Sequence, residues 1–232
     1  MIGGSSILGA ESAIEGERRA IDTERGAVTL IDAGDRVVLQ RHGIDEYRPA
    51  AEIDHRANLA ALAEAGCDRI MGLGSTGGLR AELGVGTFLC PDDFIALHLG
   101  ISMVGGHAGE QVPGFDPSWR GRLIEEWGAV EGVELRDGGV YWQTIGPRFE
   151  TPAEIRLIAE HADVVGMTIA SECVLAGELG IPYAAVCVVD NLANGVGTPL
   201  RVEDFEAGKA ANRGRLLAAL EVVLPVLADE PA

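Results

Sequence analysis

The stretch YAAVCVVDN at 183–191 constrains the fold more than any other part of the sequence. Six consecutive residues, Ala184 to Val189, are apolar, and Asp190 and Asn191 follow directly. An apolar run without alternation is typical of a strand buried on both faces, as in a parallel sheet covered by helices. Such a strand has no obvious structural use for a carboxylate and a carboxamide at its end, so both are candidates for function.

The rest of the chain alternates short apolar runs with amphipathic segments. We expect Thr151 and Ser171 to be N-caps of two of the helices, and Gly208 and Gly214 weaken the last one. Strands are predicted at 26–32, 36–40, 69–73, 86–90, 140–145, 163–168 and 183–189, and helices at 55–66, 118–132, 151–161, 171–180 and 203–227.

Strands that alternate with helices predict an α/β fold with a central mixed, mostly parallel sheet flanked by helices. No linker or composition shift marks a boundary, so residues 1–232 are expected to form a single domain. The Gly-rich segment 98–118 lacks periodicity. A loop of this length within a compact domain usually has a functional or interface role.

The composition argues against several classes of protein. Asp and Glu outnumber Lys and Arg by 36 to 18, a net charge of −18 that disfavours nucleic acid as a partner. No apolar run approaches the roughly 20 residues that span a membrane, and no secretory leader is visible. The four cysteines lack CxxC spacing and the five histidines are scattered. We therefore expect no metal site and a cytoplasmic location.

In open α/β sheets, ligands bind beyond the carboxyl ends of the strands. One group of residues at predicted strand ends offers backbone N–H groups, hydroxyls and a fixed cation, which suits a small oxyanion such as phosphate: Gly3, Gly4, Ser5, Ser6, Arg41, His42, Gly74, Ser75 and Thr168. A second group offers an aromatic face, an apolar contact and polar groups for a heterocycle edge: Phe149, Glu150, Met167 and Asn191.

Each of these residues alone also has an ordinary structural explanation, such as a tight turn, surface polarity, a helix cap or core packing. No Ser–His–Asp arrangement and no cysteine beside a base is visible in the sequence. The chemistry indicated is therefore positioning and electrostatic stabilisation rather than covalent catalysis.

Taken together and in order, these motifs resemble the trimeric purine nucleoside phosphorylase family, which includes the 5'-methylthioadenosine and S-methyl-5'-thioinosine phosphorylases. The resemblance covers 3 to about 225 and is most specific in GPRFETPAEIRLIAEHADVVGMTIASECVLAGELGIPYAAVCVVDNLANG at 146–195. Further matches are GGSSI at 3–7, RHG at 41–43 and GSTGGLRAELGVGTF at 74–88.

The resemblance implies cleavage of the N-glycosidic bond of a purine nucleoside by inorganic phosphate, a co-substrate, with no cofactor. Met167 would lie against the ribose and Phe149 against the base. The family also implies a homotrimer, or a hexamer, that acts on small molecules. Phosphate would be held by Ser5, Arg41, His42, Ser75 and Thr168.

The resemblance also indicates which purine and which 5' substituent the site would accept. Glu150 and Asn191 match the members that read a 6-oxopurine, with Glu150 accepting from N1–H and Asn191 donating to N7. Val202 stands where many inosine and guanosine enzymes have a histidine for the 5'-hydroxyl, so an apolar 5'-methylthio group is favoured. These matches favour S-methyl-5'-thioinosine, with general inosine or guanosine phosphorolysis and methylthioadenosine phosphorolysis as alternatives.

The chain departs from the family pattern at three positions near the predicted site. Ser5 replaces a threonine, Ser6 replaces a glycine, and Asp190 stands where a threonine is common. Asp190 is expected to support Asn191 or the adjoining loop beside the substrate.

Overall fold

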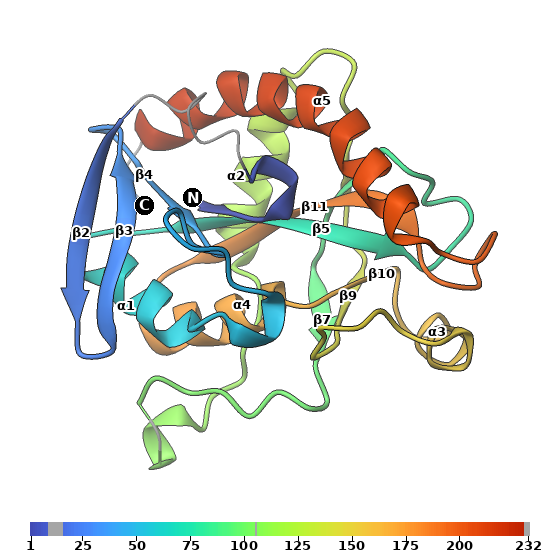
Figure 1. The fold of residues 1–232 in the computed structure, drawn as a ribbon. Helices are drawn as coiled ribbons and strands as arrows, with labels where there is room; N and C mark the ends of the chain where they lie inside the picture. The colour runs from blue at the N-terminus through green and yellow to red at the C-terminus, as the bar shows by residue number, and fades with distance from the viewer. Residues whose placement is uncertain (9–15, 105, 230–232) are drawn as a thin grey trace.

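The computed structural model describes residues 1–8, 16–104 and 106–229. They form an α/β fold around one mixed sheet, which confirms the predicted fold class (Figure 1). The strands are β1 Ile2–Gly3, β2 Glu17–Thr23, β3 Gly26–Asp32, β4 Val37–Gln40, β5 Ile70–Gly78, β6 Phe88–Cys90, β7 Asp93–Ile95, β8 Leu135–Asp137, β9 Val140–Gln143, β10 Val164–Gly166 and β11 Tyr183–Leu192.

The helices lie on the two faces of this sheet. In Figure 1, α2 and α5 cover one face of the long central strands, and α1 and α4 cover the other. No helix of the described residues is long and apolar enough to span a membrane. The α-helices are α1 His55–Glu64, α2 Pro117–Trp127, α3 Pro152–Ile158, α4 Ile169–Glu178 and α5 Val202–Asp229.

The apolar run 184–189 lies in β11, which pairs in parallel with β5. Its side chains alternate between two cores: Ala185, Cys187 and Val189 pack with α1 and α4, whereas Val186 and Val188 pack with α2 and α5. This two-sided burial explains why the run is apolar at every position.

Every predicted strand and helix is present, and the differences in number and length have local causes. Strand β2 was not predicted, because only Ile21 among its seven residues is buried and its sequence shows no apolar alternation. Strands β1, β7 and β8 have two or three residues, too few for a period. Strands β5 and β11 run further than predicted, through the Gly-rich and polar residues at their ends.

Two predictions about helix ends have opposite outcomes. Thr151 caps α3 as predicted, in a capping box with Glu154. The prediction for Ser171 is wrong, because α4 begins at Ile169 with Thr168 as N-cap and Ser171 lies within the helix. Thr168 thereby stands directly at a helix N-terminus, where the helix dipole favours negative charge.

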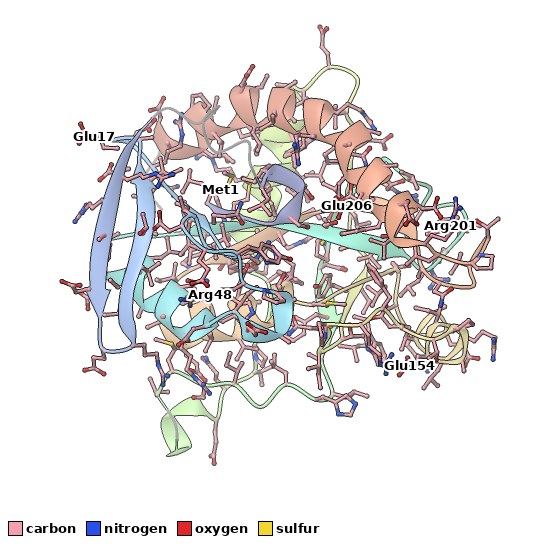
Figure 2. All side chains as sticks on the ribbon, in the orientation of Figure 1. Met1, Glu17, Arg48, Glu154, Arg201 and Glu206 are labelled. Carbon is pink, nitrogen blue, oxygen red and sulfur yellow. The ribbon has the colours of Figure 1, made fainter. Side chains whose placement is uncertain are left out.

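Helix α5 is unbroken from Val202 to Asp229, in spite of its two glycines. Gly208 has a structural reason to be there, since a Cβ at this position would lie 1.7 Å from the carbonyl oxygen of Asp190. The absence of a side chain lets α5 lie against the end of β11. Charged side chains such as Glu17 and Arg201 point outward from the fold (Figure 2).

Candidate active site

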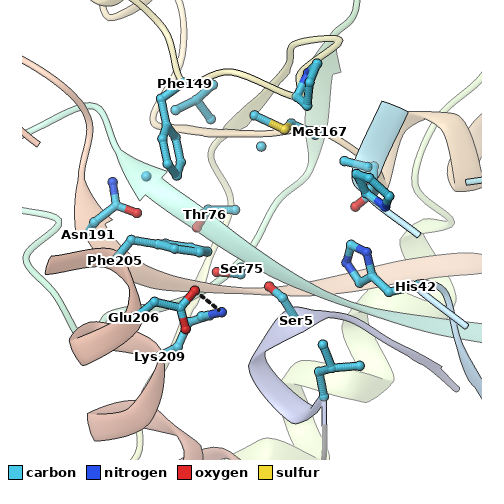
Figure 3. A pocket seen from close by; sticks show the side chains of 18 of the residues that line it. Ser5, His42, Ser75, Thr76, Phe149, Met167, Asn191, Phe205, Glu206 and Lys209 are labelled. Carbon is cyan, nitrogen blue, oxygen red and sulfur yellow. Dashed lines mark ion pairs between the residues drawn. The ribbon is translucent and has the colours of Figure 1, made fainter. Parts of the chain in front are cut away.

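A cavity of about 400 Å³ opens where β5, β10 and β11 end, between the N-terminal turn and the start of α5. Figure 3 shows Asn191, Phe149 and Phe205 on one side, His42 and Ser5 on the other, and Ser75 between them. Nine of the eleven predicted site residues line the cavity: Ser5, Arg41, His42, Ser75, Phe149, Glu150, Met167, Thr168 and Asn191. The other two, Asp190 and Val202, do not.

Two aromatic rings form one wall of the cavity. The Phe149 ring packs edge-on against Phe205, with centroids 5.5 Å apart and an interplanar angle of 68°. Phe149 remains 36% exposed, so its face is available to a ligand. A flat heterocycle fits against such a wall, because aromatic rings stack favourably on π-faces.

Glu150 and Asn191 place polar atoms beside these rings, and both are buried. Glu150 Oε1 accepts a hydrogen bond from Thr144 Oγ1 at 2.6 Å, which fixes the carboxylate. Asn191 Nδ2 donates to the carbonyl oxygen of Leu192 at 2.9 Å, and the second N–H of the amide has no partner within the described part of the chain. Together they offer an acceptor and a donor to the edge of a heterocycle.

The opposite side of the cavity carries hydroxyls and a histidine. His42 stacks on Tyr47, with centroids 5.3 Å apart, and its Nδ1 lies 2.9 Å from the carbonyl oxygen of Arg48. Burial and the neighbouring Arg41 charge lower the pKa of His42 to about 4, so the ring is neutral at pH 7. A carbonyl only accepts, so Nδ1 carries the proton and Nε2 is an acceptor.

Arg41 also lines the cavity and is held by a buried ion pair. Its Nε and Nη2 donate to Glu172 at 2.6 and 2.9 Å, and its Nη1 donates to the carbonyl oxygen of Leu73 at 2.6 Å. Three of its five N–H donors are engaged, which leaves donors for an anion. Gly4 is required here, because a Cβ would lie 2.2 Å from Nη1 of Arg41.

Asp190 does not line the cavity, and its contacts differ from the prediction that it supports Asn191 or the adjoining loop beside the substrate. Its side chain is 0% exposed, and it supports Ser75 and Ser6 rather than Asn191. A β-bulge lies at this point: β11 pairs with β5 up to Val189, and the next pair in register begins at Asn191. The bulge leaves Asp190 without a partner in the β5 ladder.

Val202 also differs from its prediction as the reader of the 5' substituent. It is the first residue of α5, is 59% exposed and does not line the cavity. Leu200 and Phe205 supply the apolar contacts on this side instead.

Sequence reasoning missed the contribution of α5 to the cavity. Glu206 and Lys209 line it and form an ion pair at 2.8 Å, marked in Figure 3, and Lys209 Nζ lies 4.5 Å from the centre of the Phe205 ring. One signal was present, since Lys209 is the only lysine in the sequence.

A second cavity of similar volume, lined by Met1 and Trp119 among others, lies elsewhere in the fold. Its charged residues already pair among themselves, as Arg36 does with Asp35 at 2.7 Å. None of the predicted site residues lines it. The convergence of predicted residues makes the first cavity the candidate active site.

Comparisons with known proteins agree with this geometry. The family model described as the Phosphorylase superfamily matches residues 7–225. A probable 6-oxopurine nucleoside phosphorylase of Archaeoglobus fulgidus is 38% identical over 200 residues, covering 84% of this chain and 82% of the relative. A probable S-methyl-5'-thioinosine phosphorylase of Pseudomonas syringae pv. tomato is 33% identical over 239 residues, covering 97% of both.

A solved structure shares the fold. Methylthioadenosine phosphorylase from Schistosoma mansoni, in complex with adenine, superposes with a TM-score of 0.85 at 23% identity. The match covers 99% of this chain and 91% of the other. At this identity the likeness concerns the fold alone.

Proposed function

The chain belongs to the phosphorylase superfamily, and on that premise we propose that it cleaves 6-oxopurine nucleosides with inorganic phosphate. The observation that carries the proposal is the division of one cavity into two chemical sides. Asn191 stands beside an aromatic wall, where Glu150 directly follows Phe149 in the chain, and Ser5 and His42 stand opposite. A purine and an oxyanion can thus be held together with the sugar between them.

The proposed reaction transfers the sugar from a purine nitrogen to an oxygen of phosphate. A phosphate oxygen bonds to C1' as the bond to the purine nitrogen breaks, and the electron pair of that bond leaves with the base. The sugar is cation-like in the transition state, while negative charge develops on the purine. Asn191 donates to N7, where that charge grows, so its hydrogen bond strengthens as the bond breaks.

Glu150 supplies selectivity for the base. An ionised carboxylate accepts from the N1–H that a 6-oxopurine carries and a 6-aminopurine lacks. Thr144 holds Oε1 at 2.6 Å, so the carboxylate is positioned in advance. A 6-aminopurine would present the N1 lone pair to this carboxylate in place of a donor, a costly arrangement in a buried site.

At the 5' position we propose S-methyl-5'-thioinosine as the first substrate to test. Relatives named S-methyl-5'-thioinosine phosphorylases and the apolar lining from Leu8, Leu200 and Phe205 support this choice. The polar pair of Glu206 and Lys209 in the same cavity makes inosine and guanosine the alternatives. Methylthioadenosine is a further alternative, although it lacks the N1–H that Glu150 would read.

A nucleoside panel assayed with and without phosphate tests the function. We expect release of hypoxanthine from methylthioinosine or inosine only when phosphate is present, and slower release of adenine from methylthioadenosine. Base release without phosphate would show hydrolysis instead. Faster release of adenine would contradict the roles of Glu150 and Asn191.

We also propose that the protein is a cytoplasmic homotrimer. Exposed apolar side chains, including Leu97, Val112, Ile145 and Leu157, support contacts between copies. The four free cysteines are consistent with a reducing compartment. Light scattering coupled to gel filtration distinguishes a trimer from a hexamer, and a monomeric mass would contradict the proposal.

A further inference from the structure

The buried carboxylate of Asp190 has three hydrogen-bond donors around it. Asn212 Nδ2 donates to Oδ1 at 2.8 Å, while the hydroxyls of Ser75 and Ser6 lie 2.5 and 3.2 Å from Oδ2. Burial raises the pKa of this carboxyl above its usual value, and the three hydrogen bonds and the nearby Lys209 charge offset only part of that rise. All three neighbours are satisfied when the carboxylate is ionised and accepts from each.

The orientation of the Asn212 amide fixes the direction of its hydrogen bond to Asp190. Its Nδ2 also donates to the carbonyl oxygen of Val189 at 3.2 Å, and a carbonyl only accepts, so the orientation of the amide is fixed. Oδ1 of Asp190 therefore receives an N–H. With the carboxylate ionised, Oδ2 accepts the hydroxyl protons of Ser75 and Ser6.

Ser75 is the member of this set that lines the cavity. A hydroxyl has one proton, and that of Ser75 is directed to Asp190 at 2.5 Å. Towards the cavity the oxygen offers only lone pairs. The neutral His42, with its proton on Nδ1, adds a second acceptor at Nε2 on the same side.

We propose that Asp190 makes the oxyanion site selective for an anion that carries a proton, so that phosphate is bound and sulfate is rejected. The inference rests on the proposed function of the cavity. Inorganic phosphate keeps at least one proton at neutral pH and donates it to Ser75 Oγ. Sulfate has none, so its oxygen meets the lone pairs of Ser75. In this arrangement Asp190 is a positioning residue that acts through Ser75.

Base release measured over a phosphate titration, with sulfate as competitor, tests the proposal. The readout is the inhibition constant of sulfate divided by the KM for phosphate, which is expected to be large in the unmodified enzyme. In Asp190→Asn the new amide donates to Ser75, whose proton then turns to the cavity. We expect the ratio to fall by about 10- to 100-fold, the range of one hydrogen bond to a charged group.

Two further variants separate this role from a general structural one. Ser75→Ala removes the acceptor, so the ratio should also fall, and adding Asp190→Asn to it should change the ratio no further. Asp137→Asn, at an exposed ion pair outside the cavity, should leave the ratio unchanged. If Asp190→Asn does not fold, Ser75→Ala alone decides the question.

An unchanged ratio in folded Asp190→Asn or in Ser75→Ala would overturn the proposal, as would sulfate binding as tight as phosphate binding in the unmodified enzyme. A protonated Asp190 that donates to Ser75 would give that last result. These outcomes leave phosphorolysis itself intact. The proposed function fails on a different measurement, base release by the unmodified enzyme without phosphate.

Discussion

Glu172 offers the sharpest test of how the cavity floor is held. Oε1 accepts from Arg41 Nε at 2.6 Å, and Oε2 accepts from Arg41 Nη2 at 2.9 Å and from the Tyr183 hydroxyl at 2.6 Å. The side chains of Arg41 and Glu172 are each 1% exposed. We consider Glu172→Gln, which keeps the shape of the side chain and removes its charge.

The expected loss of stability follows from this geometry. Both oxygens of Glu172 receive an N–H from Arg41, so either orientation of the glutamine amide places an NH₂ against a donor. Breaking a buried pair while its partner stays charged costs about 3–5 kcal/mol. For a chain of this size about 1 kcal/mol corresponds to about 2–4 °C, so the melting temperature should fall by roughly 6–20 °C.

Thermal unfolding followed by circular dichroism measures this effect. The matched control is Asp45→Asn, which breaks the pair with Arg18, whose side chains are 64% and 67% exposed. Exposed pairs contribute about 0–1 kcal/mol, so this variant should melt within about 4 °C of the unmodified protein. If Glu172→Gln melts as high as the control, the buried pair does not hold the cavity floor.

Three other perturbations have defined outcomes. Asn191→Ala should lower turnover by about 100-fold or more with an unchanged melting temperature, and undiminished turnover would remove it as the N7 donor. Burial lowers the pKa of both His42 and His55 to about 4. The unfolded chain therefore binds more protons than the folded protein below about pH 6.5. The free energy of unfolding should decrease as the pH is lowered from about 6.5 to 4, and a flat pH profile of unfolding would contradict this. Gly208→Ala places its Cβ 1.7 Å from a carbonyl oxygen and should cost about 2 kcal/mol or more, whereas Gly214→Ala, with nothing within 4 Å, should cost nothing; equal stabilities would refute the close contact.

The sequence predicted secondary structure where burial imposes a pattern on the side chains. Strand β11 was predictable because its alternate residues fill two separate cores, and α3 because Thr151 and Glu154 form a capping box. Strand β2 was not, since pairing with β3 leaves most of its side chains in water and imposes no pattern on them. Its stability comes from backbone pairing, which no side-chain pattern records.

The residues of the candidate site also differ in how far the sequence could predict them. Ser75 and Thr168 could be predicted because each comes at the end of an apolar run, Ser75 within the last part of β5 and Thr168 two residues after β10. Positions on α5 could not, because each residue along a helix turns the side chain by about 100°. Val202 faces solvent while Phe205, three residues later, lines the cavity, and the packing of α5 on the rest of the fold, including Gly208 on β11, sets that rotation.

The junction of Asp190 and Asn191 shows why sequence patterns could not assign both residues. The bulge leaves Asp190 without a partner in the β5 ladder, and Asn191 lines the cavity while Asp190 reaches Ser75. Ser6 and Asp190, both departures from the family pattern, lie 184 residues apart and meet at 3.2 Å. Because each satisfies the other, replacing either one alone with the family's residue would remove a partner from a buried polar group. The two departures therefore constitute a single structural change, at the anion side of the cavity.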